Sequence, residues 1–164
     1  MKIMIVDDDV SVLKTLKDAL TLQDYQTIGF DSPVEALQAY RQSPCEVVIL
    51  DVCMPKMDGI SLMEEIRDVN PKVRIVIVTG YADVDNAVAA LNNGAYRYLR
   101  KPIGISELND VLLHLQDEID KEVAVAARDV ELKQAFGRLT SAYHDLRDFL
   151  KSSDAIELKD NDID

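Results

Sequence analysis

The chain has 164 residues, of which 48% are hydrophobic, and its 30 acidic and 18 basic side chains leave a formal net charge of −12. This length suits one domain of ordinary size with an appendage, whereas two separate enzyme domains would be cramped. The acidic excess argues against a protein that neutralises phosphate backbones with clustered Lys and Arg, so we expect no direct binding of nucleic acid.

The cysteines and the apolar runs exclude further classes. Cys45 and Cys53 are the two cysteines of the sequence, too few for a disulfide framework or for a zinc site made from them alone. The first residues do not follow the pattern of a signal peptide, and no stretch approaches the ~20 apolar residues that span a membrane. We therefore expect a cytoplasmic protein of a reducing compartment, without a membrane partner.

Short β-branched runs alternate with segments of helical period from the start of the chain to about residue 118. The runs predict strands at residues 2–6, 26–30, 46–50, 73–78 and 95–99. The first, third and fourth are almost continuously apolar, as in interior parallel strands covered on both faces, and the other two suit the edges. Apolar spacing predicts helices near residues 12–20, 33–40, 60–69 and 84–91 and from residue 106 onward. Such βα units with right-handed crossovers predict an open, doubly wound α/β sheet.

The remainder of the chain carries a helical pattern without strands. The last helix is expected to continue beyond residue 119, with a heptad seam at Leu132, Phe136, Leu139, Tyr143, Leu146 and Leu150. Gly137 in this stretch costs roughly 1 kcal/mol relative to Ala and could kink the helix. The seam suits either pairing with a second copy or folding back as an αα-hairpin. We divide the chain into a domain (1–120), a helical extension suited to a coiled coil (121–151) and an acidic flexible tail (152–164).

Polar side chains follow four of the expected strands, at the edge of the sheet where doubly wound folds bind their ligands. They are Asp7-Asp8-Asp9 after the first strand, Asp51 after the third, Thr79-Gly80 after the fourth and Arg100-Lys101-Pro102 after the fifth. Any one of the acidic residues could be a helix cap, and Asp9 at the start of the first helix suits that role alone. The convergence of the whole set is much harder to explain by capping.

This set of residues has a definite chemistry. Carboxylates forced together repel one another unless a cation joins them, and Mg²⁺ is the hard divalent ion that such oxygens hold. Asp51 is the best candidate for a nucleophile that takes a phosphoryl group, because it ends a central strand and precedes a turn signal at Asp58-Gly59. Lys101 would neutralise the charge on the phosphoryl oxygens, and the Thr79 hydroxyl could hydrogen-bond one of them.

In their order and spacing these motifs resemble the receiver domain of bacterial two-component response regulators, over about residues 1–120. The motifs are Val6-Asp7-Asp8-Asp9, Asp51-Val52-Cys53-Met54-Pro55-Lys56-Met57-Asp58-Gly59, Val78-Thr79-Gly80 and Lys101-Pro102. The resemblance implies a flavodoxin-like sheet of order 2-1-3-4-5 followed by a long C-terminal helix. It also implies that Asp51 accepts a phosphoryl group from a sensor histidine kinase or a phosphotransfer protein, with Mg²⁺ as cofactor.

The resemblance assigns further roles residue by residue. Asp7 and Asp8 would form the acid pocket, and Mg²⁺ would be bound by Asp8, Asp51 and the backbone oxygen of Cys53, with Asp7 acting through water. Thr79, Gly80 and Lys101 would bind the phosphoryl oxygens.

Three of the assigned positions control switching or phosphoryl lifetime. Tyr98 would rotate inward when Thr79 moves, unless it is an edge-strand aromatic packed on the fourth helix. Cys53 and Tyr81 would modulate the phosphoryl lifetime: the Tyr81 ring would hinder the hydrolytic water, and the Cys53 thiol suits a small apolar filler better than a redox sensor.

Three classes of function compete. The leading interpretation is a phosphorylation-dependent binding switch that is not an enzyme, apart from slow self-dephosphorylation. Such a switch could form a homodimer through the C-terminal helix, or through the face made by the fourth helix, the fifth strand and the fifth helix. The second is an aspartyl-phosphate hydrolase of the haloacid dehalogenase type, because Asp7 and Asp9 have the Asp-x-Asp spacing; it would need a second acidic cluster where Lys101 stands. The third is a helical dimerisation scaffold that the receiver regulates.

The residues beyond the domain bear on the output. Residues 121–164 carry 7 basic and 10 acidic side chains, with no helix-turn-helix pattern and no Walker-type motif. We therefore expect no DNA-binding output and no ATPase in this chain, which is either a stand-alone regulator or a fragment of a longer protein.

Overall fold

The computed structural model of the chain describes residues 1–55, 57–80 and 91–160. The chain divides into two compact units, Met1–Gln116 and Asp117–Asp164. Among the helices in the described residues, none is long and apolar enough to cross a membrane.

The first unit is built on a sheet of five parallel strands in the order β2-β1-β3-β4-β5. The strands are β1 (Lys2–Val6), β2 (Gln26–Phe30), β3 (Val47–Leu50), β4 (Arg74–Thr79) and β5 (Arg97–Arg100). The predicted α/β fold, the sheet order and the edge positions of the second and fifth strands are thereby confirmed. The strand register pairs Val6 with Leu50 and Leu50 with Ile77, so residues that follow β1, β3 and β4 emerge at the same edge of the sheet.

Burial follows the apolar runs of the sequence. Every residue of β3 is at most 1% exposed, as is every β1 residue after Lys2, because helices cover both faces of these central strands. The outer strands β2 and β5 are less buried. The largest fully buried side chains include Tyr40, whose hydroxyl donates to the Cys45 carbonyl oxygen at 3.2 Å.

Three helices of this unit begin at the caps that their sequences provide. They are α1 (Val10–Thr21), α2 (Pro33–Gln42) and α3 (Gly59–Val69), capped by Asp9, Ser32 and Asp58. A fourth predicted helix, near residues 84–91, lies almost entirely outside the described residues. Leu91 and Asn92 are helical, and Gly94 follows with a φ of +88°, a conformation that favours glycine. The Arg67 side chain donates a hydrogen bond to the Gly94 carbonyl oxygen.

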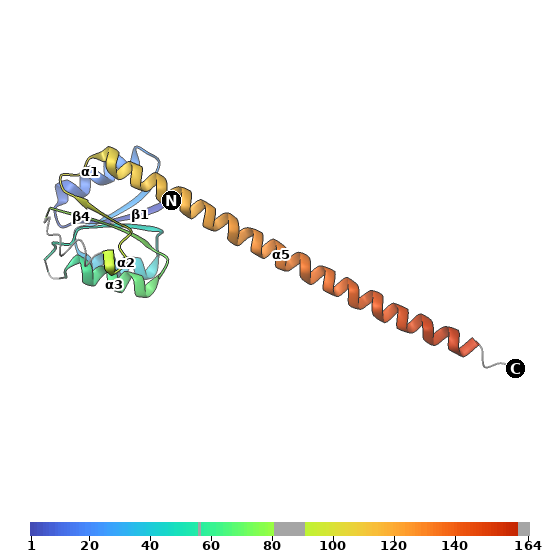
Figure 1. Ribbon diagram of the computed structural model, residues 1–164. Coiled ribbons are helices and arrows are strands. Elements are labelled where there is room, and N and C mark those ends of the chain that lie inside the picture. The colour runs from blue at the N-terminus through green and yellow to red at the C-terminus, as the bar shows by residue number, and fades with distance from the viewer. Residues whose placement is uncertain (56, 81–90, 161–164) are drawn as a thin grey trace. The chain divides into compact units, whose positions relative to one another are not determined.

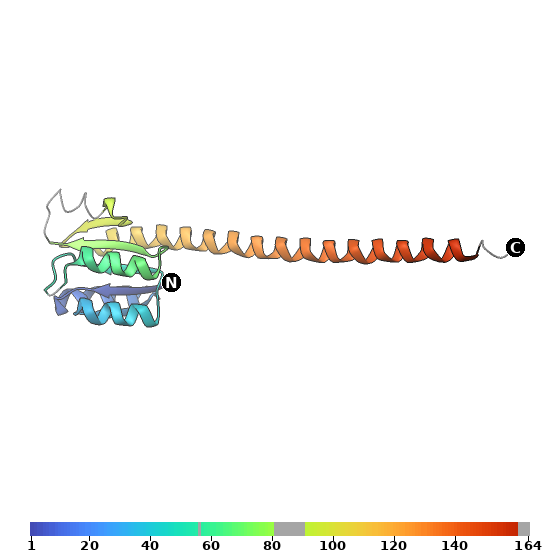
Figure 2. The same cartoon turned by 90° about the horizontal axis from the view of Figure 1, so that it is seen from below.

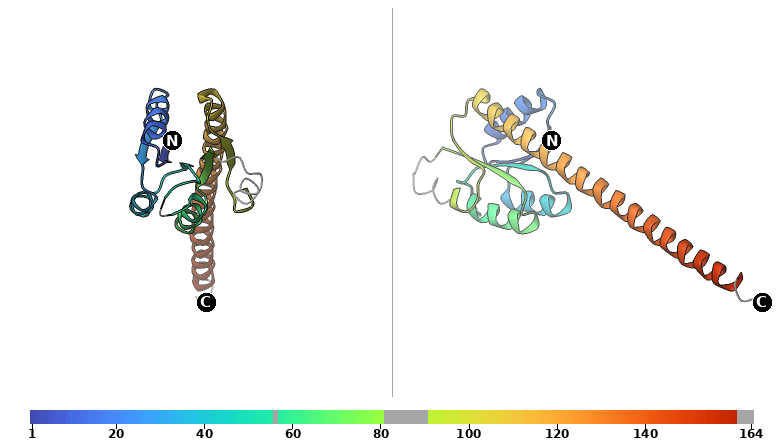
Figure 3. Two further views of the ribbon diagram at one scale, coloured as in Figure 1. Left: turned by 90° about the vertical axis from the view of Figure 1, so that its left-hand side faces the viewer. Right: turned by 45° about the vertical axis from the view of Figure 1, so that its right-hand side comes forward.

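The helices form two layers around the sheet. In Figure 1, α1 and the first turns of α5 (Ile105–Asp160) lie on one face of the sheet, and α2 and α3 lie on the other. Figure 3 shows the same separation from other sides, and Figure 2 looks onto the sheet from the side of α2 and α3. Leu108, Leu112 and Leu115 of α5 are fully buried, which ties the start of this helix to the first unit.

The second unit consists of the rest of α5, which continues without a turn through Gly137 to Asp160. The αα-hairpin alternative needs a turn that the described helix does not have, and all six residues of the heptad seam are between 54% and 70% exposed. A flexible tail was predicted from residue 152, but the helix extends to Asp160. The segment lacks Gly and Pro and contains Ala, Glu, Leu and Lys, which are strong helix formers.

Candidate functional site

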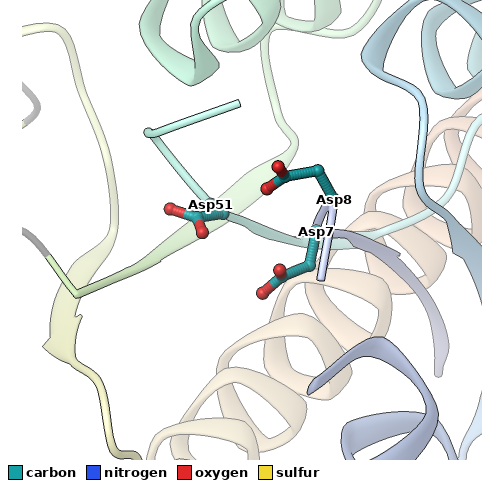
Figure 4. Close-up of side chains that lie close together, drawn as sticks. All are labelled: Asp7, Asp8 and Asp51. Atoms are coloured by element: carbon teal, nitrogen blue, oxygen red, sulfur yellow. The ribbon is translucent and has the colours of Figure 1, made fainter. Parts of the chain in front are cut away.

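Three carboxylates meet at the carboxyl ends of β1 and β3. One oxygen each from Asp7, Asp8 and Asp51 lies within 4.8 Å of the others, and Figure 4 shows their carboxyl groups directed to the same side. Asp7 and Asp51 are buried, with 2% and 6% exposure, whereas Asp8 is exposed. The site is therefore open to solvent on the side of Asp8 and closed on the side of Asp7.

The backbone at the end of β1 positions Asp7. Its N–H continues the sheet by donating to the Phe30 carbonyl oxygen at 3.1 Å, and its Oδ1 accepts from the Asp9 N–H at 3.0 Å. Asp9 itself points away from this chemistry, because its carboxylate accepts from the N–H groups of Ser11 and Val12 at the start of α1. These hydrogen bonds, above all those from Ser11, lower the pKa of Asp9. The prediction that Asp9 is a helix cap is confirmed.

Lys101, just beyond β5, joins two of the acids. Its Nζ lies 2.6 Å from Asp7 Oδ2 and 2.6 Å from Asp51 Oδ2, and its side chain is only 18% exposed. Its backbone N–H donates to the Thr79 carbonyl oxygen at 2.9 Å, which anchors the residue beside β4. The Lys101–Pro102 peptide bond is cis.

Burial and charge pairing act against each other in this triad. Burial raises the pKa of Asp7, and the hydrogen bond and positive charge of Lys101 only partly oppose that effect. Burial also works to lower the pKa of Lys101, but its hydrogen bonds to Asp51 and Asp7 outweigh this and raise it. A single cation therefore stabilises two buried carboxylates while a third carboxylate stands beside them.

The loop after Asp51 holds that residue from its other side. Asp51 Oδ1 accepts from the Cys53 N–H at 3.0 Å, and the Gly59 N–H donates to the Val52 carbonyl oxygen at 2.9 Å. A Cβ placed on Gly59 would lie 2.2 Å from the backbone oxygen of Asp51. The Asp58-Gly59 turn signal of the sequence thus has a physical reason: a side chain at position 59 would push the loop off Asp51.

Thr79 closes the site from β4. It is 1% exposed, and its hydroxyl donates to the Cys53 sulfur at 3.7 Å, a weak bond because a thiol is a poor acceptor. Gly80 follows it at an exposed position. Tyr98 of β5 is half-buried and packs against the hydrophobic core. Tyr81 lies outside the described residues, so its predicted effect on phosphoryl lifetime stays a prediction.

The donor set fits a magnesium ion. All three ligand atoms are carboxylate oxygens, the hard ligands that Mg²⁺ prefers, and they already converge in space. The repulsion among them, which Lys101 does not fully balance, is the condition under which a divalent cation binds well. The candidate protein ligands are Asp8 and Asp51, with Asp7 further inside.

Most of the predicted residues lie together, and three contacts were not foreseen. The structure brings Asp7, Asp8, Asp51 and Lys101 into one cluster, and Thr79 contacts Cys53 and the Lys101 backbone next to it. The sequence contained no signal for the second ion pair of Lys101 with Asp7, for the Thr79 to Cys53 contact, or for the close approach of Gly59 to Asp51. Each of these three contacts joins residues that are brought together by the conformation of the loops after the strands, which the sequence pattern does not reveal.

Comparisons with known proteins agree with this geometry. Residues 3–113 match the family model described as response regulator receiver domain. The chain is 31% identical over 160 residues to the regulatory protein AtoC of Escherichia coli, covering 96% of this chain and 34% of AtoC. It is 36% identical over 118 residues to the DNA-binding transcriptional regulator NtrC of Klebsiella pneumoniae, covering 70% of this chain and 25% of NtrC. The chain thus spans about a third or less of the length of these curated relatives.

Solved structures give the same result. A CheY-like response regulator receiver domain protein from Methanospirillum hungatei has a TM-score of 0.71 at 31% identity, covering 74% of this chain and 97% of that one. NtrX from Brucella abortus, in complex with ATP, has a TM-score of 0.68 at 26% identity, covering 75% of this chain and 29% of that one.

Proposed function

This chain belongs to the response regulator receiver domain family, and on that premise we propose that Asp51 accepts a phosphoryl group from the phosphohistidine of a sensor kinase or a phosphotransfer protein. The observation that carries the proposal is the buried Asp51 carboxylate at the end of β3, held by Lys101 and flanked by Asp7 and Asp8. This arrangement holds the carboxylate in place, supplies positive charge next to the phosphoryl oxygens, and offers further carboxylates that can bind a metal ion.

The transfer is a simple displacement. A carboxylate oxygen of Asp51 attacks phosphorus, the P–N bond to the donor imidazole breaks, and its electron pair stays on the imidazole nitrogen. Lys101, already 2.6 Å from Asp51, supplies positive charge next to the transferred oxygens. Mg²⁺, when bound by Asp8 and Asp51, supplies further charge neutralisation. The proposal includes the backbone oxygen of Cys53 as a third ligand, and Gly80 and Thr79 as groups that contact the phosphoryl oxygens.

The switch follows from the same contacts. The Thr79 hydroxyl donates to the sulfur of Cys53, two residues after Asp51. A phosphoryl group on Asp51 would offer this hydroxyl a stronger, charged acceptor. Movement of Thr79 toward that group would change the packing next to Tyr98, which is half-buried on the neighbouring strand. We propose that this change in β4 and β5 alters a partner surface.

A labelling experiment tests this proposal. The protein is incubated with a small acyl phosphate and Mg²⁺, and the phosphorylated residue is identified by mass spectrometry. The expected result is one acid-stable, base-labile phosphoryl group on Asp51, absent in Asp51→Asn. The matched control is Asp58→Asn, because Asp58 lies in the same loop but serves as the cap of α3. Labelling that persists in Asp51→Asn, or none in the unmodified protein, contradicts the assignment.

The hydrolase alternative is not favoured. The site has Lys101 where that class needs a late acidic cluster, and the family match is to receivers. We propose that the chain turns over no substrate beyond slow hydrolysis of its own aspartyl phosphate. Release of phosphate from an ester by the unmodified protein at a catalytic rate would contradict this.

A second role is supported by the exposed seam of the extension. Leu139 and Leu146 stand 69% and 57% exposed at heptad spacing, an arrangement that costs free energy unless another helix covers it. We propose that the extension joins copies of the chain as a coiled coil. Sedimentation equilibrium should give a mass above that of one chain for the full chain and the mass of one chain for Leu139→Lys with Leu146→Lys.

The setting of this switch is also a proposal. Cys45 and Cys53 are free thiols, which agrees with the reducing bacterial cytoplasm that we propose as its location. NtrC is named a DNA-binding regulator, and this chain matches a quarter of it. The expectation that these residues bind no nucleic acid themselves therefore stays a prediction, testable by titration with duplex DNA.

A further inference from the structure

The apolar face of the extension is wider than the heptad seam alone. In the seam, Phe136, Tyr143 and Leu150 occupy the a positions of the heptad, and Leu132, Leu139 and Leu146 occupy the d positions. The g positions, each directly before an a position, are also apolar over three heptads: Ala135, Ala142 and Phe149. At 3.6 residues per turn the combined face covers an arc of about 140° without a polar interruption. Its nine residues are all exposed: Leu132, Ala135, Phe136, Leu139, Ala142, Tyr143, Leu146, Phe149 and Leu150.

This width decides how many helices can cover the face. A two-stranded coiled coil covers the narrow seam of a and d positions, whereas helices inside a bundle present a third apolar position as well. Phe149, at a g position, is 65% exposed and would stay largely in contact with water in a two-helix pair. Ala135 and Ala142, on the same side of the seam, leave room for a further helix to approach closely.

The charges beside this face indicate what the other helices are. Lys133 and Arg147 flank the face on one side, and Glu131 and Asp145 flank it on the other, at matching intervals of two heptads. In a parallel, in-register arrangement the basic flank of one helix meets the acidic flank of the next. In an antiparallel arrangement the basic flank would lie against the basic flank of the other copy, and the acidic flank against the acidic flank. Lys133 would then face Arg147 of the other copy, and the like charges would repel.

Neither the charge of Arg138 nor the ion pair of Arg147 with Asp148 disturbs this pattern. Arg138 stands on the acidic side, where a parallel neighbour would present the uncharged Thr140. Arg147 lies 3.6 Å from Asp148 within the same helix, but both side chains are about half exposed or more and such a pair is weak. Identical copies are therefore complementary to one another when they run in the same direction.

We propose that residues 131–151 assemble as a parallel bundle of more than two copies of this chain. Each copy contributes its basic flank to one neighbour and its acidic flank to the other. Two different surfaces of the chain therefore meet in every interface, and such heterologous interfaces can close into a ring. The apolar arc points into the middle of this ring, where it is covered on both sides. The assembly goes beyond the phosphoacceptor function and does not depend on it.

The mass of the full chain tests the number of copies. Sedimentation equilibrium without phosphodonor is expected to give about three or four times the 18.4 kDa of one chain. In Ala142→Gln with Phe149→Gln the arc narrows to the a and d positions over the last two heptads, leaving only Ala135 upstream as an apolar g position, and the mass is expected to fall to two chains. The matched control, Ser141→Gln with Asp148→Gln, changes the opposite side of the helix and should keep the mass of the unmodified protein.

The direction of the helices is tested by cross-linking. In a Cys53→Ser background, Leu146→Cys places thiols at the same height in every copy of a parallel bundle and should form disulfide-linked pairs on oxidation. Asp148→Cys on the opposite side should not. Cross-linking also applies if the glutamine variant loses its helix, which circular dichroism would reveal.

Several results would overturn the proposal. A mass of one or two chains for the unmodified protein at tens of micromolar would mean that a different chain, or nothing, covers this face. An unchanged mass in a helical Ala142→Gln with Phe149→Gln, or no cross-link at Leu146→Cys, would equally refute it. Failure of Asp51 labelling leaves all of these outcomes unaffected, so the two proposals fail separately.

Discussion

Replacing Lys101 by Met removes a charge from the centre of the site and changes the side-chain volume little. The Lys101 Nζ lies 2.6 Å from both Asp7 and Asp51, whose side chains are 3% and 7% exposed. With an effective dielectric constant near 20, each contact is worth at most about 6 kcal/mol of Coulomb attraction, before desolvation is counted. Without the ammonium group, two buried carboxylates and the nearby Asp8 remain uncompensated.

The net loss must be smaller than these contacts suggest. Removing one partner of a buried ion pair typically costs about 3–5 kcal/mol. The cost is limited here because burial raises the pKa of Asp7, so this residue can take up a proton and end the repulsion. We expect Lys101→Met to lose about 2–4 kcal/mol of unfolding free energy near pH 8 without Mg²⁺. The loss should shrink as the pH falls and Asp7, whose pKa is raised by burial, takes up a proton, and also when Mg²⁺ replaces the missing charge.

Urea denaturation of both proteins, with and without Mg²⁺, measures this difference. The matched control is Lys14→Met, because Lys14 lies 2.8 Å from Asp18 in an ion pair of α1 that is more than half exposed. That control should leave the free energy of unfolding almost unchanged, because water and salt screen such an exposed pair. A loss in Lys101→Met no greater than in Lys14→Met, or a loss that does not change with pH, would refute the view that Lys101 balances buried charge.

Three further predictions concern neighbouring residues. Burial raises the pKa of Asp7 above its usual 3.8, so between these two pKa values the folded state binds more protons than the unfolded state, and stability falls as the pH rises. Asp7→Asn should flatten this fall in metal-free urea titrations. Gly59→Ala should destabilise the protein by about 2–4 kcal/mol and slow phosphorylation, because the added Cβ meets backbone at 2.2 Å, whereas Gly104→Ala, with 3.9 Å of space, should do neither. Thr79→Val keeps the side-chain shape but removes the hydroxyl that contacts Cys53, and it should abolish any phosphorylation-dependent partner binding while labelling of Asp51 persists. Retained binding in a calorimetric titration would contradict the switch.

Local patterns in the sequence account for most of the secondary structure. The apolar runs at β1, β3 and β4 are long enough to predict interior strands, and Asp9, Ser32 and Pro33 mark helix starts because a cap acts on the N–H groups next to it. The order of the strands is different in kind. Periodicity does not say which strand pairs with which, so order 2-1-3-4-5 came from the resemblance to receivers and was then confirmed by the pairing.

The types of side chain at the site were visible in the sequence, but their arrangement was not. Asp7 and Asp8 are adjacent in sequence and both contribute a carboxylate to the cluster, yet one is buried and the other exposed, a difference that the residue types alone do not reveal. The extent of the last helix was not visible in the composition either: the acidic residues 152–164 predicted a flexible tail, whereas α5 continues to Asp160.

The sequence alone therefore determined which residues end the strands, which of them cap helices, and the heptad seam of the extension, because each depends on neighbours a few positions away. The tertiary structure decided that Lys101 bridges Asp7 and Asp51, that Gly59 touches the Asp51 backbone, and that the seam stands exposed. Such contacts join residues from different strands and loops. The pairing of β1, β3, β4 and β5 decides which of these side chains are neighbours and how deeply they are buried. No local pattern in the chain encodes that pairing.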